Sequence, residues 1–341
     1  MSSTAPSALR LNAVLAGLRA AGEDTRLRLL ALLSEGDLTV SDLTDILGQS
    51  QPRISRHLKL MVDAELVSRH REGAWAFFRL AQSGEGAVLG QWLAGQLDRA
   101  DPVMASDGQR LIAVRAARGE AAQAYFARHA AEWDRIRSLH ASDNRVEDAI
   151  RDALGARRFK SVLDLGTGTG EMLKLLAPQA DRLIGVDANT SMLAVARANL
   201  SEAGLLRAEL RQADLYALPV DRQAFDLVIL HQVLHFLDDP ARAIREAALT
   251  LAPNGQLLVV DFAPHDLEFL REQYAHRRLG FADADLRQWL TDAGLHCDRI
   301  THLAPPRQGG HELTVTLWLA HKQERLVYVR PHSSFTPSWQ S

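Results

Sequence analysis

Residues 161–176 have the sequence SVLDLGTGTGEMLKLL, in which a short apolar run passes through a glycine-rich turn into a second apolar segment. An apolar run of about four to eight residues bounded by a turn is typical of a buried strand. The segment after the turn, Glu171 to Leu176, is expected to be helical. A strand, a glycine turn and a helix in this order form the opening unit of an α/β nucleotide-binding fold.

A second expected strand, Leu183 to Asp187, ends in an acid about twenty residues beyond Gly166, where a ribose-binding carboxylate belongs. A dinucleotide site would share both features. However, Asp164 precedes Gly166 by two residues, and the glycine spacing is G-x-G-x-G rather than G-x-G-x-x-G. An acid beside the loop repels a pyrophosphate and suits the ammonium group of a methionine moiety.

With these motifs, the second half of the chain resembles the class I S-adenosylmethionine-dependent methyltransferases. Residues 164–170 and 187–192 match the first two motifs of that family, and residues 212–219, 225–230 and 251–261 match later ones in order. Cys297 to His302 and Leu313 to Leu319 match the final antiparallel pair. The resemblance covers residues 125–320, and it implies a Rossmann-like seven-stranded α/β domain with S-adenosylmethionine as cofactor and S-adenosylhomocysteine as product or effector.

The resemblance also implies which residues bind the cofactor. In it, Asp187 meets the ribose, Asp214 meets the adenine amine and Asp164 lies beside the methionine moiety. The full set of expected cofactor-binding residues is Asp164, Gly166, Thr167, Gly168, Gly170, Asp187, Ala188, Met192, Ala213, Asp214, Leu215, Leu230 and His231.

Two histidines, His231 and His235, lie four residues apart directly after the expected fourth strand. Histidines at this spacing on a helix form half of a zinc-protease site, but Gln232 stands where the general-base glutamate would be. We therefore predict no metal. We expect His231 beside the sulfonium and His235 toward the substrate, with plain packing or capping as the alternative.

The catalytic residue stays open at this stage. His265 and Tyr274, with His276, Arg277 and Arg278, follow the fifth strand, where relatives recruit substrate groups. Each of them is equally compatible with a solvated helix position. The catalytic candidates are His235, His265 and Tyr274.

The first hundred residues predict a helix-turn-helix. Leucines at helical spacing follow Thr25 and stop at Glu35-Gly36; Thr39 caps a second helix that ends at Gly48. Ser50 is expected to cap a third helix that begins Gln51-Pro52, where a proline is tolerated because its missing N–H has no helical partner. Residues 66–71 and 74–80 then predict a β-hairpin that turns at Gly73, which forms a wing.

Positive charge is concentrated in this region. Between Gln49 and Leu80 there are six Arg or Lys residues and three acids, although the whole chain has a net charge of -3. Such side chains on a recognition helix bind base edges and phosphates; the alternative is a unit for protein contacts with solvated arginines. The expected DNA-binding residues are Gln51, Arg53, Ser55, Arg56, His57, Lys59 and Arg71.

The segment Glu23 to Leu80 resembles the ArsR family of bacterial repressors, most clearly in residues 51–59 and 66–73. That family binds palindromic double-stranded operators as homodimers, which here implies a dimer surface formed by Leu9 to Ala21 and Gly84 to Leu97. Many relatives sense metals through a cysteine pair in the helix that here begins Leu38-Thr-Val-Ser-Asp-Leu43. No cysteine is present there, so thiolate metal sensing at that site is excluded.

The expected organisation is a winged helix-turn-helix domain (α+β, residues 1–100), a helical connector and pocket cap (101–145), a methyltransferase domain (146–321) and a tail (322–341). Ala100 to Gly108 is expected to be a short break before a helix over Gln109 to Leu139. Tyr125, Phe126 and Trp133 recur on one side of that helix, which favours core packing over covering a pocket.

Composition limits the function. The 341 residues are 47% hydrophobic and 24% charged, no apolar run approaches the ~18 residues of a spanning helix, and no signal peptide is recognised, so we expect a cytoplasmic protein without membrane contact. Cys297 is the only cysteine, which excludes a set of several thiolates within one chain for methylating arsenic.

Three hypotheses follow. The first is a dimeric transcriptional regulator whose methyltransferase domain methylates a small molecule. The second uses the methyltransferase fold only as a sensor of S-adenosylmethionine and S-adenosylhomocysteine, for which a coupling of ~1 to 3 kcal/mol suffices. The third is an enzyme whose winged domain serves only dimerisation or substrate docking.

Overall fold

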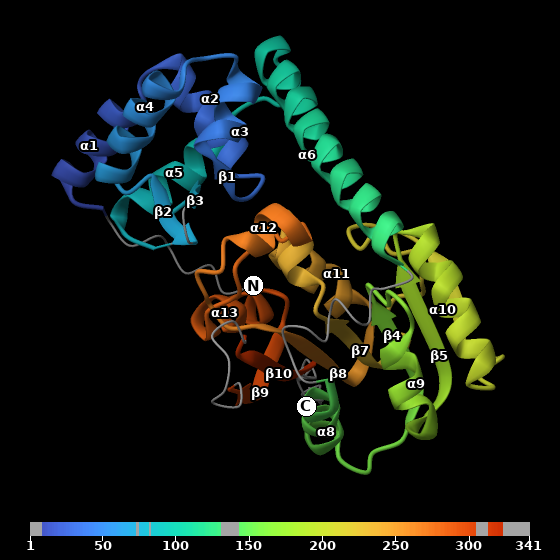
Figure 1. Ribbon diagram of the computed structural model, residues 1–341. Coiled ribbons are helices and arrows are strands. Elements are labelled where there is room, and N and C mark those ends of the chain that lie inside the picture. The colour runs from blue at the N-terminus through green and yellow to red at the C-terminus, as the bar shows by residue number, and fades with distance from the viewer. Residues whose placement is uncertain (1–8, 73–74, 82, 131–142, 305–312, 323–341) are drawn as a thin grey trace, which may run out of the picture.

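The computed structural model describes residues 9–72, 75–81, 83–130, 143–304 and 313–322. An N-terminal helical domain and a C-terminal α/β domain are joined by one long helix, α6 (Figure 1). The expected hairpin turn at Gly73, Trp133 and the tail beyond Lys322 lie outside the described residues.

The N-terminal domain is a winged helix-turn-helix, as predicted. A core of leucine and isoleucine side chains holds its helices together, among them Leu30, Ile46 and Ile54, all fully buried. Its elements are α1 (Leu11–Ala21), α2 (Asp24–Leu33), β1 (Leu38–Thr39), α3 (Val40–Leu47), α4 (Gln51–Asp63), β2 (Val67–Glu72), β3 (Trp75–Leu80) and α5 (Glu85–Gln96). The strands form a sheet in the order β1-β3-β2.

The helix boundaries in this domain follow from capping. Thr39 and Asp42 form a reciprocal capping box at the start of α3, and Gly48 ends that helix with a φ of +63°. The start of α4 is as predicted, with Pro52 in its first turn, but the Ser50 side chain makes no capping hydrogen bond. The proline therefore contributes more to this boundary than the serine does.

The expected break at Ala100 to Gly108 is wrong, because α6 spans Pro102–His129. The Asp101 side chain accepts hydrogen bonds from the N–H groups of Val103 and Met104 and thereby caps the helix. Pro102 therefore starts the helix instead of breaking it, and Gly108 is tolerated inside it. At about 1.5 Å per residue, its 28 residues extend about 42 Å, from α2 and α3 to the methyltransferase-like half (Figure 1).

The C-terminal domain contains the predicted seven-stranded sheet, in the order β6-β5-β4-β7-β8-β10-β9. All described strand pairs are parallel except those of β10, which is antiparallel to both neighbours. The strands are β4 (Phe159–Leu165), β5 (Ala180–Asp187), β6 (Glu209–Gln212), β7 (Phe225–His231), β8 (Leu251–Phe262), β9 (Leu295–Leu303) and β10 (Val315–Lys322).

Helices cover both faces of this sheet, so the central strands are buried on both sides and consist of apolar runs. From β4 the chain adds strands first on one side and then on the other, which leaves a crevice at the carboxyl ends of β4 and β7. The helices are α8 (Asp143–Leu154), α9 (Glu171–Leu176), α10 (Thr190–Glu202), α11 (Pro240–Thr250), α12 (Phe269–Tyr274) and α13 (Asp283–Asp292), with the 3-10 turn η3 (Leu234–Phe236). No helix in the described ranges is long and apolar enough to cross a membrane.

Candidate functional site

A cavity of about 650 Å³ opens at the carboxyl ends of the central strands, and its size is typical of a small-molecule site. The loop after β4, the tip of β5 and the segment after β7 form one side of it, and α6 forms the other. The cavity therefore lies where a doubly wound sheet binds its ligand.

The glycine loop after β4 needs glycine for two reasons. Gly166 and Gly168 have φ values of +74° and +53°, which L side chains rarely adopt. In addition, a Cβ on Gly166 would collide with the side chain of Val233, which lines the cavity. The loop is anchored to β5, because the N–H groups of Gly166 and Thr167 both donate to the carbonyl oxygen of Val186.

Asp187 lies at the tip of β5 and lines the cavity. One of its carboxylate oxygens accepts the N–H of Gly168 at 2.9 Å, and the other accepts the N–H of Asn189 at 2.8 Å. Burial raises the pKa of Asp187, and these backbone hydrogen bonds oppose that effect. The glycine loop and the acid are thus joined into one rigid wall.

Asp164 lies in the same wall but is fixed differently. It is 2% exposed, and its carboxylate accepts the hydroxyl of Thr167 at 2.6 Å. A buried carboxylate that lines the cavity suits a cationic group of a ligand. Its expected role beside the methionine moiety stays a prediction.

Most of the expected cofactor-binding residues line this cavity. Leu230 is fully buried in the core, and Gly170 and Ala213 also lie outside the lining, although Ala213 donates its N–H to the carbonyl oxygen of Asp187. The expected residues that line the cavity are Asp164, Gly166, Thr167, Gly168, Asp187, Ala188, Met192, Asp214, Leu215 and His231.

The other wall of the cavity belongs to α6. Tyr125 is buried, as the packing interpretation expects, but the adjacent Phe126 lines the cavity, so the helix both packs and covers the pocket. The side chain of Asn189 caps α10 and donates to the side chain of Gln123 at 2.8 Å. The sequence showed the aromatic stripe of α6 but not which face of the helix would meet the cavity. The lining residues from α6 are Ile112, Arg115, Ala116, Gln123 and Phe126.

In the winged domain, α4 exposes most of its expected DNA contacts. Its buried face is Ile54, Leu58 and Met61, as predicted. His57 differs, because its ring is half-buried and lies 3.4 Å from the guanidinium of Arg26; burial lowers its pKa. The exposed members of the predicted set are Gln51, Arg53, Ser55, Arg56, Lys59 and, on the wing, Arg71.

Comparison with known proteins gives matches to both halves. A model described as a methyltransferase domain matches residues 163–259, and one described as a bacterial regulatory protein of the arsR family matches residues 23–69. The ubiquinone/menaquinone biosynthesis C-methyltransferase UbiE of Escherichia coli (strain K12 / DH10B) is 31% identical over 175 residues, which cover 47% of this chain and 70% of UbiE. The chain belongs to the class I methyltransferases.

Other similarities cover less of their proteins or show the fold alone. The uncharacterized methyltransferase YcgJ of Bacillus subtilis is 34% identical over 106 residues, which span 31% of this chain and 42% of YcgJ. A chain in a solved complex of the Haloferax volcanii Trm112 methyltransferase activator is 20% identical with a TM-score of 0.50, covering 59% of this chain and 97% of that one. Accordingly, this chain joins an ArsR-type winged domain to a class I methyltransferase domain.

Within the methyltransferase domain, His231 and His235 do not share a helix face. His231 ends β7 and lines the cavity, whereas His235 lies in η3 and is 2% exposed. The expectation that His235 points toward the substrate is wrong: its Nδ1 lies 2.7 Å from the fully buried carboxylate of Asp261, behind the cavity wall. The described residues contain no group of three or more potential metal ligands.

Backbone strain marks the same wall. Gln232, between the two histidines, has a φ of +50°, lines the cavity and donates its N–H to the carbonyl oxygen of Val260. A left-handed conformation in a residue other than glycine is uncommon and concentrates at functional sites. Nothing in the sequence signalled this strain.

The remaining catalytic candidates do not line the cavity. Tyr274 ends α12 and packs edge-on against Phe269. His265 lines a smaller hollow of about 260 Å³ between the two domains, and burial lowers its pKa to about 4, which keeps it neutral. Arg277 and Arg278, by contrast, hold the cavity wall from behind, because both of their N–H groups donate to the carbonyl oxygen of His235.

Proposed function

We propose that this protein is a DNA-binding transcriptional regulator whose methyltransferase domain binds S-adenosylmethionine and methylates a small molecule. The observation that carries the proposal is the presence, in one chain, of an exposed basic recognition helix and a ligand-sized cavity lined by Asp187 and the glycine loop. The similarity to UbiE, a C-methyltransferase of ubiquinone and menaquinone biosynthesis, supports a small-molecule methyl acceptor.

The residues present fit S-adenosylmethionine. Asp187 lines the cavity where a ribose-binding carboxylate is expected, and a Cβ on Gly166 would collide with Val233 in the cavity wall. Asp164 provides negative charge for the ammonium group, and Met192 and Leu215 provide apolar contact for the adenine. The cofactor supplies an electrophilic methyl group; the protein orients it and excludes water through the walls formed by α6 and η3.

The DNA-binding half of the proposal rests on α4 and the wing. Exposed arginine and lysine side chains bind phosphates, and Gln51, Arg53 and Ser55 at the start of the helix are able to contact base edges. The expected dimer surface also has physical support. Helices α1 and α5 pack against each other and expose Leu11, Leu18 and Trp92 to solvent, so we propose that a second copy covers them.

A second candidate function is a sensor of S-adenosylmethionine and S-adenosylhomocysteine without catalysis. The observation that favours it is that α6, which packs against the helix-turn-helix, forms one wall of the cavity. Of the described histidines, only His231 lines the cavity, and the catalytic candidates His235, His265 and Tyr274 do not. A general base for the methyl acceptor is thus unassigned.

The first experiment is calorimetric titration of the wild-type protein and Asp187→Ala with S-adenosylmethionine and S-adenosylhomocysteine. DNA sites selected from a random pool are then titrated with each ligand present. Tight binding that Asp187→Ala loses, together with selection of a defined DNA site, supports the proposal; absence of both refutes it. Ligand-dependent DNA affinity without methyl transfer to an extract of small molecules would establish the sensor. Ligand binding without a selected site would favour an enzyme that uses its winged domain only for dimerisation or docking.

A further inference from the structure

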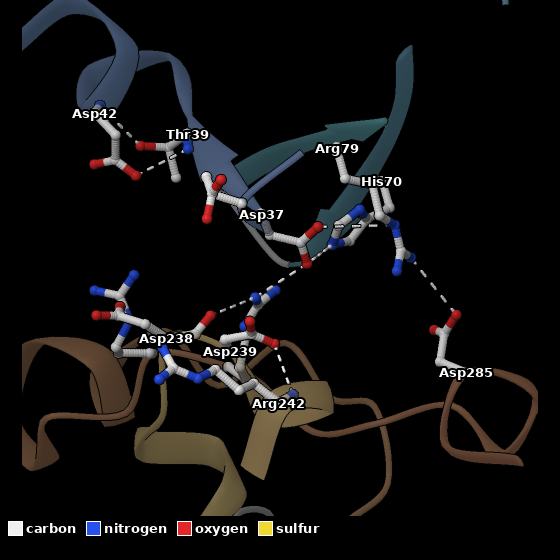
Figure 2. A network of polar contacts seen from close by, with 12 residues as sticks. Asp37, Thr39, Asp42, His70, Arg79, Asp238, Asp239, Arg242 and Asp285 are labelled. Atoms are coloured by element: carbon white, nitrogen blue, oxygen red, sulfur yellow. Dashed lines mark hydrogen bonds and ion pairs between the residues drawn. The ribbon is translucent and has the colours of Figure 1, made fainter. Parts of the chain in front are cut away.

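One acidic side chain of the winged domain lies at the centre of its contact with the methyltransferase domain. Asp37, between α2 and β1, has a carboxylate oxygen 3.0 Å from the guanidinium of Arg278. His70 and Arg79, from the two wing strands, lie 3.6 and 3.7 Å from the same carboxylate. Figure 2 shows this network, in which Arg79 also reaches Asp285 on the methyltransferase side.

This contact is buried, unlike an ordinary surface ion pair. The side chains of Asp37 and Arg278 are 10% and 4% exposed, and the guanidinium of Arg278 also lies 4.4 Å from the ring centre of Phe77 in β3. Removing one partner from such a pair is strongly destabilising, because it leaves a buried charge without its counter-charge. The Arg278 side chain therefore contacts both the turn before the helix-turn-helix, at Asp37, and the wing, at Phe77.

The other end of Arg278 holds the cavity wall. Its backbone N–H and that of Arg277 donate to the carbonyl oxygen of His235, and its guanidinium donates to the carbonyl oxygen of Asp238 at 3.3 Å. Arg277 adds an ion pair with the Asp238 carboxylate. Phe236, Leu237 and Asp238 all line the cavity, so one short segment faces the ligand on one side and Arg278 on the other.

Helix α6 provides a second, parallel connection. Near its start, Asp107 forms a two-fold ion pair with Arg28 of α2, at 2.6 and 2.7 Å, and the Arg115 guanidinium donates to the carbonyl oxygen of Glu35. Near its end, Gln123 accepts from Asn189, two residues beyond Asp187. Both connections lead from residues at the cavity to the segment from α2 to β1.

We propose that Arg278 is a positioning residue that, through Asp37, couples occupation of the cavity to the position and order of the wing and helix-turn-helix. This inference rests on the proposed cofactor binding and goes beyond it, because it assigns the route. A ligand that fills the cavity contacts α6 and the segment 236–238. It changes the position of the winged domain only if it binds more tightly when that domain is in one position than in another. Asp37 and Arg278 are the contact through which that difference passes.

The test is hydrogen exchange of the full-length protein with and without saturating S-adenosylhomocysteine. In the wild type, ligand is expected to slow exchange in α3, β2 and β3 by about fivefold or more. Helix α1, at the far end of the winged domain in Figure 1, is the internal reference for a general gain in stability. In Asp37→Asn, ligand is expected to bind with near wild-type affinity while this protection is lost.

Two further variants make the outcome decisive. Asp285→Asn removes the more exposed contact with Arg79 and is expected to keep the protection. Arg278→Lys keeps the charge but loses the fork-shaped geometry, and it replaces Asp37→Asn if that variant fails to fold. Failure of the wild type to bind the ligand would refute the proposed function. Binding without protection of the wing, or full protection in Asp37→Asn (in Arg278→Lys, if Asp37→Asn does not fold), would overturn the coupling alone.

Discussion

Asp187 is subject to two opposing effects, because burial penalises its charge while the proposed contact with a ribose requires it. Burial raises the pKa of this carboxyl above the ordinary 3.8, so it takes up a proton at a higher pH than a free aspartate does. A protonated carboxyl loses acceptor capacity for ribose hydroxyls. We therefore expect affinity for S-adenosylhomocysteine to fall as pH is lowered, beginning above the usual range of an aspartate. Calorimetry from about pH 8 to about pH 4.5 measures this. Asp187→Asn, as control, binds weakly at every pH; a flat wild-type profile would contradict the prediction.

Gly166 allows a second prediction at this scale. Gly166→Ala introduces both backbone strain at a φ of +74° and a collision with Val233, whereas Gly204→Ala introduces strain at a φ of +71° with open space around the new methyl group. The strain costs ~1–2 kcal/mol at either position. We expect urea unfolding to show this loss in both variants and ligand binding to be lost only in Gly166→Ala. Equal ligand binding by the two variants would argue against close approach of the loop to the cavity wall.

At the scale of elements, α6 is attached to the winged domain by the pair of Arg28 with Asp107, whose side chains are 16% and 4% exposed. Arg28→Ala leaves the buried Asp107 carboxylate without its partner, which we expect to destabilise the winged domain by about 3 kcal/mol. Urea unfolding followed by circular dichroism measures the effect. The double variant Arg28→Ala with Asp107→Ala is expected to recover part of the loss, and additive losses would show that the pair does not interact.

Helix α4 is predicted to carry the DNA contacts. Arg56 is exposed on it, and Arg56→Ala is expected to weaken binding to the selected DNA by ~1–3 kcal/mol if it contacts a base. If it contacts a phosphate, the loss is uniform across sequences and the salt dependence becomes less steep. Fluorescence anisotropy at several salt concentrations distinguishes the two. Arg182→Ala, which removes an exposed arginine of β5, is the control; an unchanged affinity for Arg56→Ala would exclude the side chain from the interface.

The sequence predicted the elements that repeat a local pattern and missed those defined by long-range contacts. The glycine loop, the acid at Asp187 and the helix cap at Thr39 each depend on residues close together in the chain, and all three are present. His235 was misplaced because its partner, Asp261, comes from a neighbouring strand. The start of α6 was missed because a proline such as Pro102 is favoured in the first turn of a helix but disrupts the interior of one.

At the scale of the whole molecule, the exposed apolar face of α1 and α5 predicts association. Leu11 and Trp92 are 73% and 58% exposed, which costs free energy unless a second copy covers them. Trp92→Glu is therefore expected to convert a dimer into a monomer and to weaken DNA binding. Light scattering after gel filtration measures the mass. Leu206→Glu, on a leucine that is 79% exposed in the other domain, is the control, and a monomeric wild type would contradict the prediction.

The contact between Asp37 and Arg278 joins positions 241 residues apart. At synthesis rates of about 5–20 residues per second, Arg278 leaves the ribosome about 12 to 48 seconds after Asp37. Because domains fold as units in the order in which they emerge, the winged domain completes its own core while the rest of the chain is still being made. Each newly made molecule thus passes through an interval in which its DNA-binding half exists without the domain that would govern it.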